Sequence, residues 1–139
     1  MLAAPDGTLG RCATLNLAAL RRDPIGVRAA LTPELQKALR MDSQPCQIAA
    51  AHMAYAGCTA EALEWLEVAI DRGFVNFPFL AQHDRLLAPL RTLPEFHLLM
   101  QRARREYEAA IAEFVDPADQ PKHYAEVAHA AASLPAPVA

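Results

Sequence analysis

The sequence has little cysteine, little glycine and few aromatic residues. The first two shortages each argue against a class of structure. Its three cysteines are an odd number and form no Cys-x-x-Cys pair, so neither a disulfide framework nor a zinc site is indicated. Five glycines and few β-branched runs argue against a sheet. Alanine, the best helix former, dominates instead. We therefore expect an all-α protein with no metal and no cofactor.

Long apolar runs and a strong net charge are also missing. No apolar stretch approaches the ~20 residues of a membrane span. The formal net charge of −3 gives no general attraction to nucleic acid or to anionic membranes. Residues 1–7 lack the basic and apolar regions of a signal peptide. We therefore expect a cytoplasmic protein that binds neither nucleic acid nor membrane.

The motifs of the common enzyme classes are missing as well. The only serines are Ser43 and Ser133, and neither lies in a Gly-x-Ser-x-Gly motif. The five histidines form no metal-binding pattern, and His83 with Asp84 would need further ligands that the sequence does not identify. Phosphate-binding glycine loops are absent. We therefore expect no enzymatic activity and keep an undetected enzyme or metal-binding protein as the third alternative.

Helix-start and helix-stop residues divide the chain into short helices. Asp23 and Thr32 each precede a proline, which combines a favourable N-cap with proline at the first helical position. Gly57 and Gly73 end apolar-periodic stretches, as glycine does at helix C-termini. A hydrophobic connector, residues 74–83, follows the predicted helix 59–72. The predicted helices are 12–22, 24–31, 33–41, 45–56, 59–72, 85–91 and 93–114.

The last segment, residues 116–139, differs from the rest because it is rich in alanine and proline. Four apolar residues at helical spacing could form one weak amphipathic helix there: Tyr124, Val127, Ala131 and Leu134. We expect the final residues to be disordered. The predicted organisation is one domain, residues 1–115, followed by this Ala/Pro-rich tail.

Residues 45–72 carry a recognisable pattern of small and large apolar positions. The positions that matter are Ala50, Gly57, Ala62, Leu66 and Ala69. They resemble a tetratricopeptide repeat (TPR), a pair of antiparallel helices of about 34 residues whose close crossing needs small side chains. The closing proline of such a repeat is missing, and Gly73 stands there instead.

The resemblance continues on both sides of this repeat, from about residue 31 to residue 115. The matching pieces occur in order: Leu31–Leu35, Glu61–Glu67, Arg72–Leu80, His83-Asp84, Leu90-Arg91 and Pro94–Met100. They are similar to the C-terminal segment of bacterial TPR arrays, including arrays attached to serine/threonine kinases and signalling regulators. The resemblance implies antiparallel helical hairpins stacked as a short right-handed solenoid. In this solenoid the clear repeat is 45–72, and a capping segment, 74–115, ends in a long C-terminal helix.

The resemblance also implies a binding surface. TPR arrays bind peptides or protein surfaces in a concave groove lined by the first helix of each repeat. The residues carried over by position are Gln44, Gln47, Ala51, Ala54 and Tyr55. One repeat cannot bury its own face, so the flanking helices or a second chain must close the core.

Four aromatic residues in and after the repeat have two interpretations. Phe74, Phe77 and Phe79 either fold back over the open end of the hairpin, as solenoid ends require, or form an exposed interaction patch. Trp65 either packs against the flanking helices or anchors a partner. We favour the covering role for the connector and keep all four as candidate partner-binding residues.

Charged and thiol groups of the repeat also allow two interpretations each. Glu61, Glu64 and Glu67 form an acidic row, which we expect to be solvated, with attraction of a basic partner as the alternative. Cys58 lies just before a helix start, a setting that can make a thiol reactive. The alternative is an inert turn residue.

These patterns favour a non-catalytic protein–protein interaction module, an adaptor or scaffold that binds a protein or peptide partner. The alternative is a structural or regulatory end-piece, related to a larger signalling protein, that self-associates as a homodimer through an apolar face. The two hypotheses differ in whether the groove beside Gln47 and Tyr55 is open.

Overall fold

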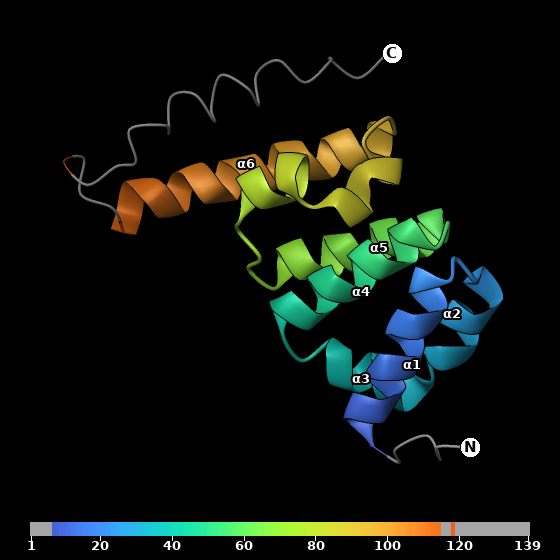
Figure 1. Cartoon of the computed structure of the whole chain (residues 1–139). Helices are drawn as coiled ribbons and strands as arrows, with labels where there is room; N and C mark the ends of the chain where they lie inside the picture. Colours follow the sequence, from blue (N-terminus) through green and yellow to red (C-terminus); the bar gives the residue numbers. More distant parts are fainter. Residues whose placement is uncertain (1–6, 115–117, 119–139) are drawn as a thin grey trace.

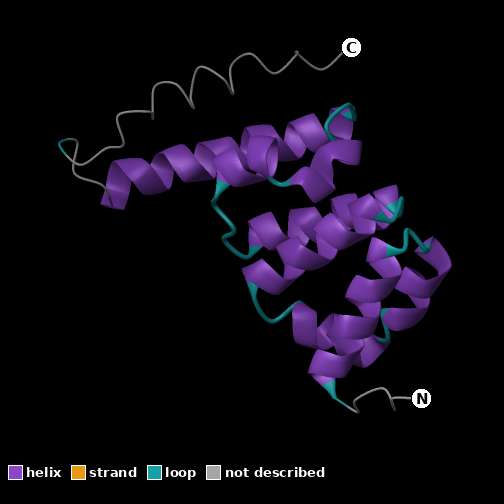
Figure 2. Ribbon diagram, viewed as in Figure 1, coloured by secondary structure: helices purple, strands orange, loops and turns teal. Residues whose placement is uncertain are grey.

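The computed structural model describes residues 7–114 and residue 118. Over this part the chain is helical and contains no strand (Figure 1 and Figure 2). None of the helices described is both long and apolar enough to cross a membrane. In chain order they are α1 (Thr8–Leu20), α2 (Pro24–Ala30), α3 (Pro33–Leu39), α4 (Ser43–Tyr55), α5 (Thr59–Asp71), the π-helical turn η1 (Phe79–His83), the 3₁₀ helix η2 (Arg85–Leu90) and α6 (Pro94–Phe114).

The prediction of an all-α protein is confirmed, and the predicted helices lie close to the observed ones. Two differences have local causes. Helix α1 begins at Thr8 rather than at residue 12, because its buried face extends back to Gly10. The connector contains η1, whose first amide, from Phe79, donates to the side chain of Asn76 at 3.3 Å. The predictions for residues 116–139 fall outside the described residues, apart from Ala118.

The predicted N-caps before α2 and α3 are formed. The carboxylate of Asp23 accepts a hydrogen bond from the amide of Gly26 at 2.9 Å. The hydroxyl of Thr32 accepts one from the amide of Leu35 at 3.3 Å. Each bond satisfies an amide that has no partner inside its helix. The chain can therefore change direction twice within 20 residues and still satisfy its helix ends.

The turn between α4 and α5 depends on a glycine in the left-handed region. Gly57 has φ of 86°, and the amides of Gly57 and Cys58 donate back to the carbonyls of Ala54 and Met53 at 3.1 and 2.9 Å. This pair of bonds is a Schellman motif, which satisfies the free carbonyls at a helix end. Arg22 takes the equivalent position after α1 with φ of 53°, the one positive value at a non-glycine residue in the described part.

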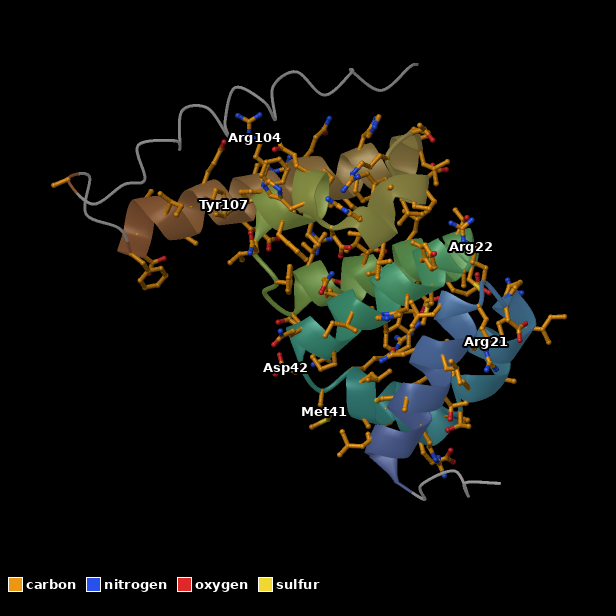
Figure 3. All side chains as sticks on the ribbon, in the orientation of Figure 1. Arg21, Arg22, Met41, Asp42, Arg104 and Tyr107 are labelled. Carbon is orange, nitrogen blue, oxygen red and sulfur yellow. The ribbon has the colours of Figure 1, made fainter. Side chains whose placement is uncertain are left out.

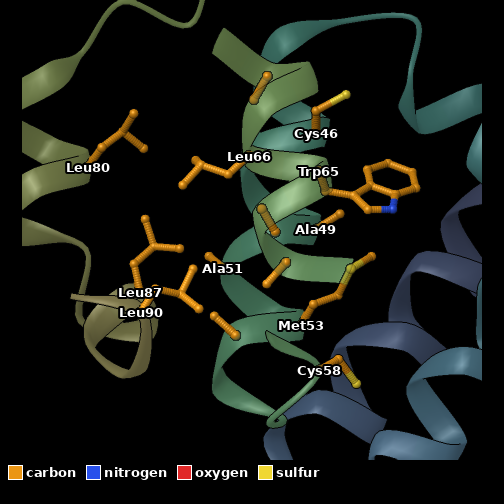
Figure 4. Close-up of a cluster of buried hydrophobic side chains, with 14 of the residues drawn as sticks. Cys46, Ala49, Ala51, Met53, Cys58, Trp65, Leu66, Leu80, Leu87 and Leu90 are labelled. Carbon is orange, nitrogen blue, oxygen red and sulfur yellow. The ribbon is translucent and has the colours of Figure 1, made fainter. Parts of the chain in front are cut away.

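Helix α4 is the centre of the molecule. It contacts α5, α1, α3 and η2, and seven of its thirteen residues are buried. Ala50 in α4 and Ala62 in α5 have no exposed surface, so small side chains allow the two helices to approach closely. Figure 4 shows the resulting core on both sides of this hairpin. Trp65 and Cys58 lie on the side of the N-terminal helices, and Leu80 of η1 with Leu87 and Leu90 of η2 lies on the other side.

Helix α6 covers the C-terminal side of the core with only its first half. Its buried residues are Phe96, Met100 and Ala103, and none follows Ala103. Tyr107 still contacts the connector, with its ring centroid 6.4 Å from that of Phe77. Beyond it the helix projects from the body (Figure 1), and Phe114 is 78% exposed.

Gly57→Ala tests the turn that joins α4 and α5. An added Cβ would meet no atom within 4 Å, so the substitution strains the backbone without a clash. We expect a loss of about 1 kcal/mol in the free energy of unfolding, because a left-handed conformation is costly for alanine. Urea unfolding measures it, and an unchanged midpoint would contradict the assigned turn geometry.

Candidate functional site

The groove predicted beside α4 is filled by the chain itself on the η2 side. Gln47, Ala51 and Ala54 are 5%, 2% and 1% exposed, and η2 lies against α4. The expectation that these three side chains face an open groove is therefore corrected. One repeat has too little core of its own, and η2 supplies the missing apolar surface.

A buried hydrogen bond holds this filling segment in place. The Gln47 amide donates to the Asp84 carboxylate at 2.6 Å. The other oxygen of Asp84, which is 6% exposed, accepts from the amide of Leu86 at 3.0 Å and caps η2. Arg91 adds a hydrogen bond from its guanidinium to the backbone carbonyl of Asp84 at 2.7 Å. The Gln47 side-chain nitrogen and both Asp84 carboxylate oxygens therefore have partners, as burial requires.

The other side of α4 stays accessible. Gln44 is exposed, Ile48 is 41% exposed and Tyr55 is half-buried; their spacing of four and seven residues puts them on one face of the helix. The guanidinium of Arg22 lies over the Tyr55 ring, 4.7 Å from its centroid. Figure 3 shows Arg22 near one end of α4 and Asp42 at the other. Two of the five predicted groove residues thus remain available to a partner.

An apolar cleft of about 360 Å³ opens beside this face, between α1, α3 and α4. Its volume lies within the range of ligand pockets, roughly 300–1,000 Å³. The walls are mostly aliphatic, and Asn16 is one of few polar groups among them. The cleft therefore suits an apolar side chain better than a charged reactant. Its main lining residues are Cys12, Leu15, Asn16, Leu39, Ile48 and Ala49.

Large exposed apolar residues also lie along α1, outside the lining of the cleft. Leu9, Leu17 and Leu20 are 87%, 48% and 60% exposed. Such a concentration on one small protein marks a candidate interaction surface. The prediction for the binding face did not include α1. Its leucines gave a signal, because Leu9, Leu15, Leu17 and Leu20 are spaced so that they spread over about 200° of the helix and cannot all face one core.

The four candidate aromatic residues contribute less exposed surface than a partner site needs. Trp65 and Phe77 are each 3% exposed, and the guanidinium of Arg40 lies 4.6 Å from the centroid of the Trp65 ring. Phe74 and Phe79 are half-buried and pack against the core. The covering interpretation of the connector therefore agrees with the structure better than the exposed patch does.

The acidic row on α5 is paired within the chain. Arg28 pairs with Glu61 at 2.5 Å, Arg40 with Glu64 at 2.7 Å and Arg102 with Glu67 at 3.8 Å. The hydrogen bond from Arg28 lowers the pKa of Glu61. Exposed pairs of this kind contribute little stability, yet they link α5 to three neighbouring segments. A basic partner would have to displace these arginines.

The thiols do not form a reactive centre. Cys46 and Cys58 are buried, and burial raises the pKa of both; for Cys58 the nearby Arg28 only partly opposes it. The interpretation of Cys58 as a reactive thiol is therefore not supported. Cys12, half-buried, lines the cleft. Within residues 7–114, no group of three histidine, cysteine or acidic side chains is arranged to hold a metal ion.

Comparison of the chain with family models, curated proteins and solved structures gave no match. The function must therefore be argued from the surface of this molecule alone. Its candidate site is the cleft between α1 and α4 with the exposed residues beside it. The arrangement offers apolar contact area and few polar groups.

Asp84→Ala tests the segment that fills the predicted groove. It leaves the buried amide of Gln47 without its acceptor and removes the cap of η2. We expect a loss of about 2–3 kcal/mol in the free energy of unfolding and a smaller loss for Asp84→Asn. Asp42→Ala is the control, because the Asp42 side chain makes no capping bond to α4. Equal losses for Asp84→Ala and Asp42→Ala in chemical unfolding would contradict this account.

The cysteines should react at different rates with a thiol reagent. We expect Cys12 to react in the native protein, and Cys46 and Cys58 only after unfolding, because burial raises their pKa and blocks access. Spectroscopic counting of modified thiols measures this, and Cys12→Ser should abolish the fast reaction. Two fast thiols in the native protein would contradict the assignment.

Proposed function

We propose that this protein is a non-catalytic interaction module that binds a partner protein through the surface between α1 and α4. The observation that carries the proposal is the apolar cleft lined by Leu15, Leu39 and the exposed Ile48. Among the described residues that line it, Cys12 is the one titratable group. Acid–base catalysis needs positioned titratable groups, so binding fits this cleft better than catalysis does.

The order of the helices supports a short TPR-like stack as the scaffold of this module. Along one side α1 contacts α4 and α4 contacts η2. Along the other side α5 contacts α6, and ion pairs join α2 and the end of α3 to α5. In a TPR array the first helices line the binding groove. The α1–α4 surface occupies that position in the proposed stack.

The second candidate function is a self-associating end-piece, and the projecting half of α6 favours it. Phe114 lies 78% exposed at the end of a helix that no longer contacts the core. Burial of a phenylalanine ring contributes about 2 kcal/mol. A partner surface that covered Phe114 would therefore stabilise the complex by about this amount. Under both candidates the chain works through protein contacts.

Ile48→Glu tests the binding surface, with Ile25→Glu as the matched control at an exposed isoleucine outside the cleft. The native chain would be crosslinked in its cells and the captured proteins identified by mass spectrometry. We expect Ile48→Glu to reduce specific capture about tenfold or more, because a buried unpaired carboxylate is costly, and Ile25→Glu to retain it. Equal capture by all three chains would exclude the cleft as the binding site.

A further inference from the structure

The projecting end of α6 has the features of a ligand for the cleft between α1 and α4. It is a preformed helix, it is apolar at Ile111 and Phe114, and it carries exposed Glu113. Phe114 is among the most exposed large apolar residues in the described part, at 78%. A cavity of about 150 Å³ can hold a benzene ring. The cleft, at about 360 Å³, therefore has room for the Phe114 ring and for part of a second side chain.

The charges of the two surfaces are complementary. Residues 7–40 contain six basic and two acidic side chains, whereas residues 106–114 contain three acidic and no basic ones. Ion pairs within the chain already hold Arg11, Arg28 and Arg40 in the first segment, and Glu106 and Glu108 in the second. Within the described residues Arg21 and Glu113 form no ion pair, and Arg22 makes only its contact with Tyr55. The basic end of one molecule therefore attracts the acidic helix end of another.

The spacing of these groups also agrees between the two helices. Arg22 lies over Tyr55, which is seven residues after Ile48 on the same face of α4, or about 10 Å along it. Glu106 lies eight residues before Phe114, or about 12 Å along α6. With Phe114 beside Ile48 and α6 antiparallel to α4, Glu106 comes near Arg22. Glu106 already shares Arg102 with Asp71, so Arg102 keeps a carboxylate partner if Glu106 turns toward the second molecule.

We propose that the cleft between α1 and α4 binds the α6 end of a second copy of this chain, with Phe114 as the anchoring side chain. This inference rests on the proposed function, because it names the occupant of the same surface. The contact area is small, so association is weak and depends on protein concentration. Because Arg22 and Glu113 are exposed, added salt weakens it.

The test is sedimentation velocity of the full chain over a wide concentration range. We expect the average mass of the native protein to rise with concentration. Phe114→Ala should weaken association about tenfold or more, as the loss of an aromatic anchor does. Leu98→Ala is the matched control, because Leu98 is exposed on α6 outside the projecting end. A native protein that stays monomeric at its highest soluble concentration would overturn the inference.

A mixing experiment then tests which surfaces meet. The Phe114→Ala chain keeps an intact cleft, and the Ile48→Glu chain keeps an intact α6 end. Each variant alone should stay monomeric, and an equal mixture should form one-to-one complexes. The Cys12 thiol reports occupancy of the cleft, so its modification should slow in the Phe114→Ala chain when the Ile48→Glu chain is added. No complex and no protection of Cys12 would overturn the inference.

The outcomes separate this inference from the function on which it rests. If the native chain is monomeric but Ile48→Glu still loses its captured partners, the second copy is the wrong occupant and the proposed function stands. If Phe114→Ala abolishes association while Ile48→Glu leaves it unchanged, the α6 end binds elsewhere and the inference is wrong. If Ile48→Glu alters neither capture nor association, both proposals fail.

Discussion

The close packing of α4 against α5 is the contact on which the other features of this molecule depend. It is possible because alanine occupies the crossing, at Ala50 and Ala62, and because Gly57 allows a turn with positive φ. A helix in this central position needs partners on every side. The neighbouring helices therefore pack against α4. Only the part of α4 that they do not cover is accessible to a partner.

The two sides of α4 differ in what covers them. On one side η2 lies over Ala51 and Ala54, and Asp84 satisfies the buried amide of Gln47. On the other side the α1 contact leaves an apolar cleft and a row of exposed leucines. Under the proposed function, a partner would bind on the α1 side, because the buried hydrogen bond between Gln47 and Asp84 closes the other side. Under the further proposal, the exposed end of α6 would occupy this cleft in a second molecule.

Local chemistry made much of the fold predictable. Asp23 and Thr32 were expected to cap α2 and α3 and do so, and Gly57 ends α4 as expected. The candidate site was less predictable. Gln44 and Tyr55 are accessible, but Gln47 is buried by Asp84, a residue 37 positions away, and helical periodicity carries no information about such distant pairs. The cleft was missed because its walls come from three helices, of which only α4 was assigned to the binding face.

The sequence by itself determined that this chain is helical and where most helices begin and end. These properties depend on side chains within a few positions of one another. Only the tertiary structure decided which face of α4 stays open, that Trp65 and Phe77 are interior, and that the acidic row on α5 is paired with arginines. Those outcomes depend on which distant segment reaches a given surface, and that is settled by competition for burial across the whole chain.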